Sequence, residues 1–356
     1  MTPREKEIID LIKSNPMISQ QEIAEKLNIT RSGVSTHINN LSNQGFIIGR
    51  GYILREDEYV AILGGCNMDI VGSSFNKLKD KDSNPGRITY SSGGVARNIC
   101  ENLSRLEVNT TFLSVLGEDD AGVKIFEELN ALNVDTSKIL FENGDTPHYL
   151  AVLDDEKDMR VAISDMELLK KIDKDYILKN KTILENAKYV VVDTNLEKET
   201  LEVIYKNVDA KLLIDGVSTV KALKLKDILD GIYFLKLNIY EAKALADVES
   251  DNLEEIGKNL ISKGLHSLVI TAGEKGSYYF DKDNFIIKES RPIEVVNASG
   301  AGDAFMAGYV YGLFNEYDIK DRLSVADAMA RIALKSESTS SEEINLKNLE
   351  DELNEF

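Results

Sequence analysis

Short apolar runs alternate with helical stretches along most of the chain, from residue 59 to residue 273. Strand-like runs that are separated by helices are the pattern of a mostly parallel sheet with both faces covered by helices. The runs are YVAILGG, TTFLSVLG, AKYVVVDT, AKLLIDG, IYFLKLN and HSLVITAG. The sequence therefore predicts an α/β fold for this part of the chain.

Ligands of such sheets bind beyond the carboxyl ends of the strands. Polar residues follow several of the predicted strands directly, where such a site would lie. They are Asn67, Asp69, Asp193, Asn195, Asn238, Glu241, Thr271 and Gly273. Two further segments, at about residues 70–92 and 146–165, have the pattern of hairpins. We expect them to form a small separate β-sheet that covers the site as a lid.

The first 57 residues have a different pattern, with three short helices and a Gly-rich hairpin. Ser19 and Glu22 have the spacing of a capping box that begins the second helix. Thr30 can cap the third helix, which is predicted over residues 31–43 and exposes short polar side chains. This order resembles the winged helix-turn-helix family of bacterial regulators, in which the second helix of the pair lies in the major groove of DNA. The alternative is a small helical module for dimerisation or packing.

The net charge of −19 is unevenly distributed. Residues 1–56 hold seven Lys/Arg and six Asp/Glu, a net charge of +1, so the remaining residues carry about −20. Because an acidic body is repelled by nucleic acid, any contact with double-stranded DNA is expected from residues 1–56. A nearly neutral helix-turn-helix predicts weak affinity for DNA in a single copy. We therefore expect a homodimer, with the lid as its interface.

The composition argues against several other classes of protein. No run of 18 apolar residues is present to span a membrane, and the N-terminus lacks the apolar region of a secretion signal. Two cysteines in 356 residues indicate a reducing compartment, so a cytoplasmic location is expected. Three scattered histidines argue against a histidine metal site.

The stretch NASGAGDAFMAGY places three small residues, Gly300, Ala301 and Gly302, immediately before Asp303. Small residues at the start of a helix let backbone N–H groups approach an anion closely. A carboxylate beside such a pocket can accept the proton of an attacking hydroxyl. The helix dipole is expected to lower the pKa of Asp303 and make it a weak base, which a loose phosphoryl-transfer transition state tolerates. The alternative is a helix cap whose glycines permit close packing.

This stretch resembles the C-terminal signature of the ribokinase-like, or PfkB, carbohydrate kinase family. Other motifs agree with the resemblance in family order: GGCNMD, SSGGVARNICENLSRL, NIYEA and TAGEKG. Their order and spacing are most similar to those of pseudouridine kinases and related nucleoside kinases, some of which carry an N-terminal helix-turn-helix. The resemblance implies a ribokinase-like three-layer sandwich with a β lid over residues 58–356, preceded by a winged-helix domain over residues 1–57.

The resemblance also implies roles for individual residues. Asp303 resembles the catalytic base, and the backbone of residues 300–302 resembles the anion hole for the transferring phosphate. The residues that match those holding the sugar are Asn67, Asp69, Gly93, Gly94 and Asn98. The residues that match those contacting ATP, or ordering Mg²⁺ largely through water, are Asn238, Glu241, Thr271, Gly273 and Gly276. No direct protein ligand of the metal is expected, and the adenine pocket is expected near residues 334–343.

One departure from the family pattern concerns Asn297, where many relatives have an aspartate that helps to hold K⁺. The loss of that charge argues against activation by a monovalent cation. The leading hypothesis is an ATP-dependent kinase for the 5′-hydroxyl of a ribonucleoside, with pseudouridine first among the candidates. The alternatives are a transcription regulator with a kinase-like domain that senses a nucleoside or sugar, and a kinase for a free sugar such as ribose or a fructose derivative.

Overall fold

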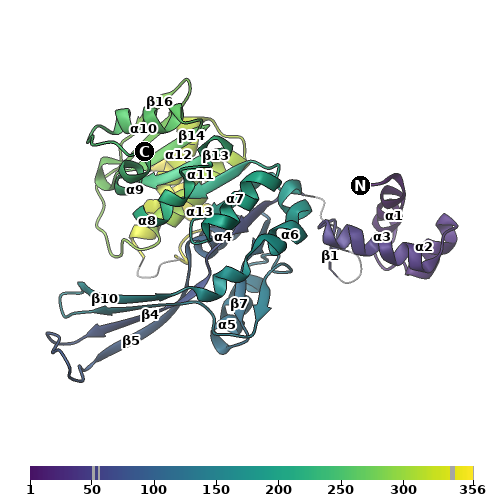
Figure 1. Ribbon diagram of the computed structural model, residues 1–356, viewed down its shortest axis with the longest axis horizontal. Helices are drawn as coiled ribbons and strands as arrows, with labels where there is room; N and C mark the ends of the chain where they lie inside the picture. Colours follow the sequence, from purple (N-terminus) through teal and green to yellow (C-terminus); the bar gives the residue numbers. More distant parts are fainter. Residues whose placement is uncertain (50–52, 55–56, 337–340, 356) are drawn as a thin grey trace.

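The computed structural model describes residues 1–49, 53–54, 57–336 and 341–355. Residues 50–52 and 55–56 belong to the predicted wing and residues 337–340 to the predicted adenine pocket, so these parts of the two predictions lie outside the described residues. Figure 1 shows a large α/β body and, at its side, a small body formed by the first three helices.

An eight-stranded sheet runs through the α/β body in the order β16-β15-β14-β13-β12-β11-β3-β6. The strands from β14 to β6 in this order are parallel, and β15 pairs antiparallel with β14 on one side and with β16 on the other. The strands are β3 (Val60–Leu63), β6 (Thr110–Leu113), β11 (Tyr189–Asp193), β12 (Leu212–Asp215), β13 (Ile232–Asn238), β14 (Ser267–Thr271), β15 (Ser277–Asp281) and β16 (Phe285–Lys288). β7 (Val115–Gly117) and β8 (Leu140–Glu142) form a separate parallel pair. The predicted mostly parallel sheet is confirmed.

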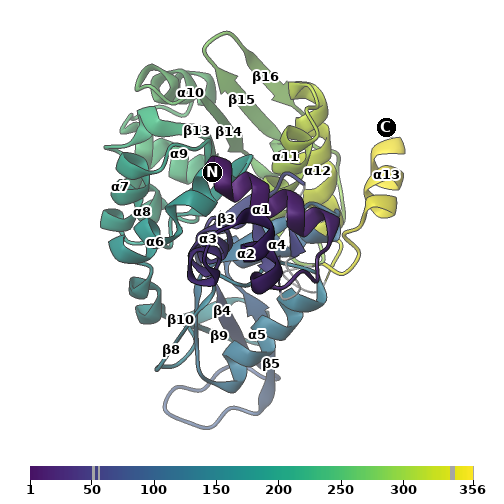
Figure 2. The same cartoon turned by 90° about the vertical axis from the view of Figure 1, so that its right-hand side faces the viewer.

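Helices cover both faces of this sheet (Figures 1 and 2). One layer consists of α4 (Val95–Arg105), α5 (Asp120–Ala131), α11 (Ala301–Phe314), α12 (Ile319–Leu334) and α13 (Leu346–Asn354). The other consists of α6 (Lys174–Asn186), α7 (Lys198–Asn207), α8 (Thr219–Ala222), α9 (Ile239–Ala246) and α10 (Leu253–Ser262). Short 3₁₀ helices lie at Glu167–Lys171, Leu223–Leu225, Leu229–Gly231 and Gly273–Lys275. Of the helices that the structure describes, none combines the length and apolarity needed to cross a membrane.

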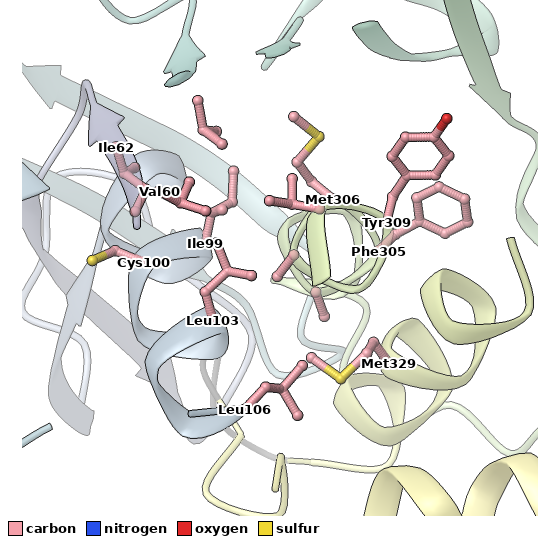
Figure 3. Close-up of a cluster of buried hydrophobic side chains, with 14 of the residues drawn as sticks. Val60, Ile62, Ile99, Cys100, Leu103, Leu106, Phe305, Met306, Tyr309 and Met329 are labelled. Atoms are coloured by element: carbon pink, nitrogen blue, oxygen red, sulfur yellow. The ribbon is translucent and has the colours of Figure 1, made fainter. Parts of the chain in front are cut away.

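The side chains of each central strand alternate between two apolar cores, one on each face of the sheet. Val60 joins the core under α4, α11 and α12, whereas its neighbour Ala61 joins the core under α6, α7 and α9. Figure 3 shows the first of these cores, in which Ile99 of α4 and Met306 of α11 lie in one cluster. A period of two along a strand is what places alternate side chains on opposite faces. The three-layer fold class is therefore confirmed.

A second sheet of four strands projects from the α/β body (Figure 1), in the order β10-β9-β4-β5. Its strands are β4 (Asn67–Ser74), β5 (Gly86–Gly93), β9 (His148–Leu153) and β10 (Met159–Asp165). The two segments with hairpin patterns thus lie in one sheet, which we call the lid. Only residues 64–66 separate β3 from β4, so the lid begins at the carboxyl end of a central strand.

The N-terminal body contains α1 (Pro3–Ser14), α2 (Gln20–Leu27) and α3 (Arg31–Asn43), followed by β1 (Ile47–Gly49) and β2 (Ile53–Leu54), which pair antiparallel. Ser19 and Glu22 form the predicted capping box, and Thr30 caps α3. The body touches the larger one where Asn186 Nδ2 of α6 donates a hydrogen bond to the Gln44 carbonyl at 3.2 Å. It has its own apolar core, formed by Ile8, Ile12, Ile18, Ile23, Ala24, Val34, Ile38, Leu41 and Ile47.

Candidate active site

The carboxyl ends of the central strands bring charged and amide side chains to one edge of the sheet. β11 ends at Asp193 and β12 at Asp215, and these two residues are paired in register. β13 ends at Asn238 and β14 at Thr271, which are also paired. Residues that are far apart in the sequence therefore meet at the edge where ligands of such sheets bind.

Asp303 lies in the first turn of α11, whose N-cap Gly300 has a φ of 81°. This left-handed conformation favours glycine, because a Cβ would be strained there. Asn98 Nδ2, in the first turn of α4, donates a hydrogen bond to Asp303 Oδ2 at 2.8 Å. The predicted base thus directly contacts a residue predicted to hold the sugar, although 205 positions separate the two in the sequence.

The pKa of Asp303 is raised from its ordinary value to about 7. Burial is the main cause and the charge of Asp215 adds to it, while Lys236 and the hydrogen bond from Asn98 act in the opposite direction. The expectation that the helix dipole lowers this pKa is therefore wrong, because removing the carboxylate from water outweighs the dipole. A base with a pKa near the working pH is suited to accept the proton of an alcohol.

The reaction rate is expected to follow the ionisation of Asp303. Only the ionised carboxylate accepts a proton, so kcat/KM should fall about tenfold for each pH unit below about 7. Initial rates measured between about pH 5 and about pH 9 check this prediction. A profile that stays flat down to about pH 5 would rule out Asp303 as the titrating base.

The residues predicted to hold the sugar lie at the base of the lid. Asn67 Nδ2 donates a hydrogen bond to Asp69 Oδ1 at 2.6 Å. A Cβ on Gly93 would lie 2.2 Å from Asp69 Oδ2, so the glycine makes room for this carboxylate. Gly94 has a φ of 101°, and a Cβ there would lie 2.5 Å from the Gly65 carbonyl oxygen. Both glycines are therefore explained by close approach, and contact with a sugar stays a prediction.

Asp193 organises the loops around this group. Its carboxylate is fully buried and accepts hydrogen bonds from the backbone N–H groups of Gly65 and Ala96, each at 2.9 Å. It also accepts bonds from the backbone N–H and the side-chain amide of Asn195, again at 2.9 Å. One carboxylate thus joins the link between β3 and β4 to the start of α4. The sequence indicates Asp193 as a polar residue that follows a predicted strand, but its role in joining these two segments was not predicted.

Lys236 and Asp215 form an ion pair that the sequence analysis missed. Lys236 Nζ donates a hydrogen bond to Asp215 Oδ2 at 2.9 Å, and both side chains are buried. The sequence does contain a sign of a buried ion pair, because Lys236 is a charged residue inside the apolar run IYFLKLN. A buried lysine is rare unless it is paired, so its place in a central strand indicates a specific partner.

A cavity of about 620 Å³ opens beside the start of α11. Five residues that were predicted to contact the phosphates line it: Thr271, Gly273, Gly276, Ala301 and Gly302. The next residue along the chain, Asp303, contacts Asn98 instead. Ala301 and Gly302, in the first turn of α11, therefore lie between a cavity of a size typical for ligands and the predicted sugar residues, while Gly300 is not among the lining residues. Leu334, which belongs to the predicted adenine stretch, also lines the cavity. The lining residues that were not predicted as site residues are Glu274, Ser290, Arg291, Pro292, Ile293, Val295, Ala298, Phe305, Asp327, Ala330 and Arg331.

Asn238 and Glu241 form a capping box at the start of α9. Asn238 Oδ1 accepts from the Glu241 N–H at 2.9 Å, and the two oxygens of Glu241 accept from the backbone and the side chain of Asn238 at 2.8 and 2.6 Å. Oxygen donors of this kind suit Mg²⁺, which keeps several of its waters in proteins. Both carboxylate oxygens of Glu241 already accept hydrogen bonds within the capping box. Asn238 and Glu241 therefore fit a hydrated Mg²⁺ ion that they would hold through its water molecules.

Residues 57–345 match the family described as pfkB family carbohydrate kinase, and residues 1–48 match a winged helix-turn-helix DNA-binding family. The chain belongs to the pfkB family of carbohydrate kinases. It is therefore a phosphotransferase with an alcohol group as acceptor.

Relatives of this pfkB kinase include two proteins of Escherichia coli (strain K12). The uncharacterized sugar kinase YeiI is 34% identical over 354 residues, which is 98% of this chain and 98% of that protein. The pseudouridine kinase is 34% identical over 306 residues, or 83% of this chain and 96% of that protein. Among solved structures, a carbohydrate kinase from Agrobacterium tumefaciens is 26% identical, with a TM-score of 0.72 over 84% of this chain and 97% of that one.

Proposed function

We propose that this pfkB kinase transfers the γ-phosphate of ATP to the 5′-hydroxyl of a ribonucleoside, with pseudouridine as the first candidate. The observation that carries the proposal is the contact between Asp303 and Asn98, at the point where the loop lining the large cavity meets the predicted sugar residues. The identity of 34% with a pseudouridine kinase supports this choice of substrate.

The arrangement supports an in-line displacement. The 5′-oxygen forms a bond to the γ-phosphorus, the bond from that phosphorus to the bridging oxygen breaks, and the electron pair leaves with ADP. The hydroxyl proton goes to Asp303, which Asn98 orients. Backbone N–H groups at the start of α11 face the charge that develops on the phosphoryl oxygens, as helix N-termini do for anions. When bound, Mg²⁺ near Asn238 and Glu241 would neutralise negative charge on the phosphates.

A thermal-shift screen against nucleosides and free sugars tests the substrate class. A nucleoside at 100 times its Kd should raise the stability of the fold by about 2.7 kcal/mol, and with all compounds at one common concentration pseudouridine should give the largest shift. A coupled assay of ADP release with the same compounds then separates binding from turnover. If ribose or a fructose derivative is bound and phosphorylated while every nucleoside is inert, the sugar-kinase alternative replaces this proposal.

A second function, binding of double-stranded DNA, rests on the N-terminal body. Helix α3 occupies the position of the recognition helix in a helix-turn-helix. It exposes Arg31, Ser32, Thr36 and Asn39, whose side chains can contact base edges and phosphates. The match of residues 1–48 to a DNA-binding family supports it. Fluorescence anisotropy with DNA from upstream of the gene, at low salt and with or without nucleoside, tests it. No binding under any of these conditions would remove the regulatory role.

Two copies of the chain would bind DNA better than one, and the lid offers a surface for pairing. Ile163, Leu150, Ile70 and Tyr90 are paired in register across the four lid strands, and Ile163 and Tyr90 are 63% and 61% exposed. Contiguous exposed apolar patches mark interaction sites. Light scattering on the I163D variant should show loss of a dimer, whereas A162D, on the opposite lid face, should keep it. A monomeric wild-type protein would contradict the homodimer.

A further inference from the structure

Lys236 is buried where an apolar side chain would be expected. It lies in β13, a central strand whose other residues are almost all apolar, and is 7% exposed. Its Nζ atom donates a hydrogen bond to Asp215 at the end of the neighbouring strand. Burying an ion pair costs free energy, and a protein in which well-packed apolar residues replace such a pair is often equally stable or more stable. Stability alone therefore does not account for this lysine.

The ammonium of Lys236 reaches the loop at the start of α11. A Cβ built on Gly302 would lie 2.8 Å from Lys236 Nζ, closer than a Cβ atom approaches an atom that is not bonded to it. Gly302 therefore makes room for this ammonium, and Gly302 also lines the large cavity. The positive charge of Lys236 thus lies directly against the backbone whose N–H groups are proposed to receive the phosphoryl group.

The charges around Lys236 keep it protonated. Burial by itself lowers the pKa of Lys236, but Asp215, Asp303 and Glu241 outweigh that effect, and its pKa is raised. These carboxylates come from β12, α11 and α9, the elements that surround the end of β13, and Asp193 of β11 adds a further negative charge near Asp303. Lys236 is therefore a fixed cation within a group of carboxylates, at the place where a chain of phosphates would bring further negative charge.

We propose that Lys236 is a positioning residue for phosphoryl transfer. Held by Asp215, its ammonium fixes the Gly302 backbone and Asp303 relative to each other and places positive charge beneath the incoming phosphoryl group. This inference rests on the proposed kinase chemistry but not on the identity of the alcohol. Lys236 takes no proton in the reaction, since the hydroxyl proton goes to Asp303, and it acts through the loop and through its charge.

The test uses three variants of the full chain: K236M, D215N and the double variant K236M/D215N. The double variant removes both charges of the pair together, so neither member is left as an unpaired buried charge and the fold should be retained. K224M is a matched control, because Lys224 is a half-buried lysine whose Nζ donates hydrogen bonds to the Thr194 and Leu196 carbonyls, away from Gly302. Thermal unfolding and direct titration with nucleoside and with ATP establish folding and binding before any rate is measured.

The double variant is expected to fold and to bind the nucleoside nearly as the wild type does, while kcat falls by about 10²–10³-fold, the loss seen when one preorganised charge-stabilising group is removed. K224M should keep the wild-type kcat. The acid limb of the pH–rate profile should move to higher pH in K236M, because a cation beside Asp303 is lost, and to lower pH in D215N, because an anion is lost.

A folded double variant with wild-type kcat would overturn the role of Lys236, as would single variants whose acid limbs do not move. If the proposal that the substrate is a nucleoside is wrong, a different result is expected. In that case the wild type itself leaves nucleosides unphosphorylated and turns over a sugar, and the same variants compared on that sugar still decide the role of Lys236.

Discussion

Replacing Asp303 with asparagine is expected to lower turnover by about 10²–10⁴-fold, with the affinity for the nucleoside nearly unchanged. The amide has the shape of the carboxylate and can still accept the hydrogen bond that Asn98 donates to Asp303. It cannot take up the proton of the attacking hydroxyl, so the variant loses an interaction made in the transition state and keeps those made in the ground state. Steady-state kinetics with a coupled ADP assay, together with calorimetric titration of the nucleoside, measure the two effects separately.

Asp120 provides a matched control for this substitution. It also lies in the first turn of a helix, α5, but it is exposed and belongs to no part of the candidate site. D120N should therefore keep the kcat of the wild type. If D303N retained its turnover as well, Asp303 would be a structural cap and the proposed mechanism would lose its base.

The second large effect is expected on stability, from replacing Asp193 with alanine. The fully buried carboxylate accepts four hydrogen bonds from three residues, Gly65, Ala96 and Asn195. Without it, the buried N–H groups of Gly65 and Ala96 have no acceptor, and each such donor costs about 1–3 kcal/mol. We expect D193A to lower the free energy of unfolding by about 3 kcal/mol or more, and to weaken substrate binding because the loops it joins carry the residues predicted to hold the sugar.

Urea denaturation with linear extrapolation measures this loss. Thr194, the next residue, is the matched control, because it is fully buried and its hydroxyl makes one hydrogen bond, to the Gly216 carbonyl at 2.7 Å. T194V should cost about 1 kcal/mol. A loss in D193A no larger than that in T194V would show that water replaces the carboxylate and that the loops do not depend on it.

The layered fold could be predicted from the sequence because its signals are local and repeated. Apolar runs such as AKYVVVDT must be buried on both faces, and the helices between them leave a parallel sheet as the simplest arrangement. The same pattern predicts a site at the carboxyl ends of the strands. Asp193, Asn238 and Thr271 each end a strand, and the structure brings them to one edge of the sheet.

The contacts inside the site could not be predicted in this way, because they depend on which strands are neighbours and in which register. Lys236 meets Asp215 since β12 and β13 are adjacent and these two residues are paired, and the sequence contains no local sign of that register. The pKa of Asp303 was misjudged for a similar reason. The helix dipole is a local property that can be read from α11, whereas burial depends on the whole fold.

The long separation between Asn98 and Asp303 has a consequence for how the enzyme becomes active. Contacts between residues far apart in sequence form late in folding, since the loop between them must be closed first. During synthesis, α4 leaves the ribosome long before α11, so the early part of the domain can fold while the base is still missing. A growing chain therefore lacks the proposed base until α11 has been made, and the same helix also completes one of the two cores.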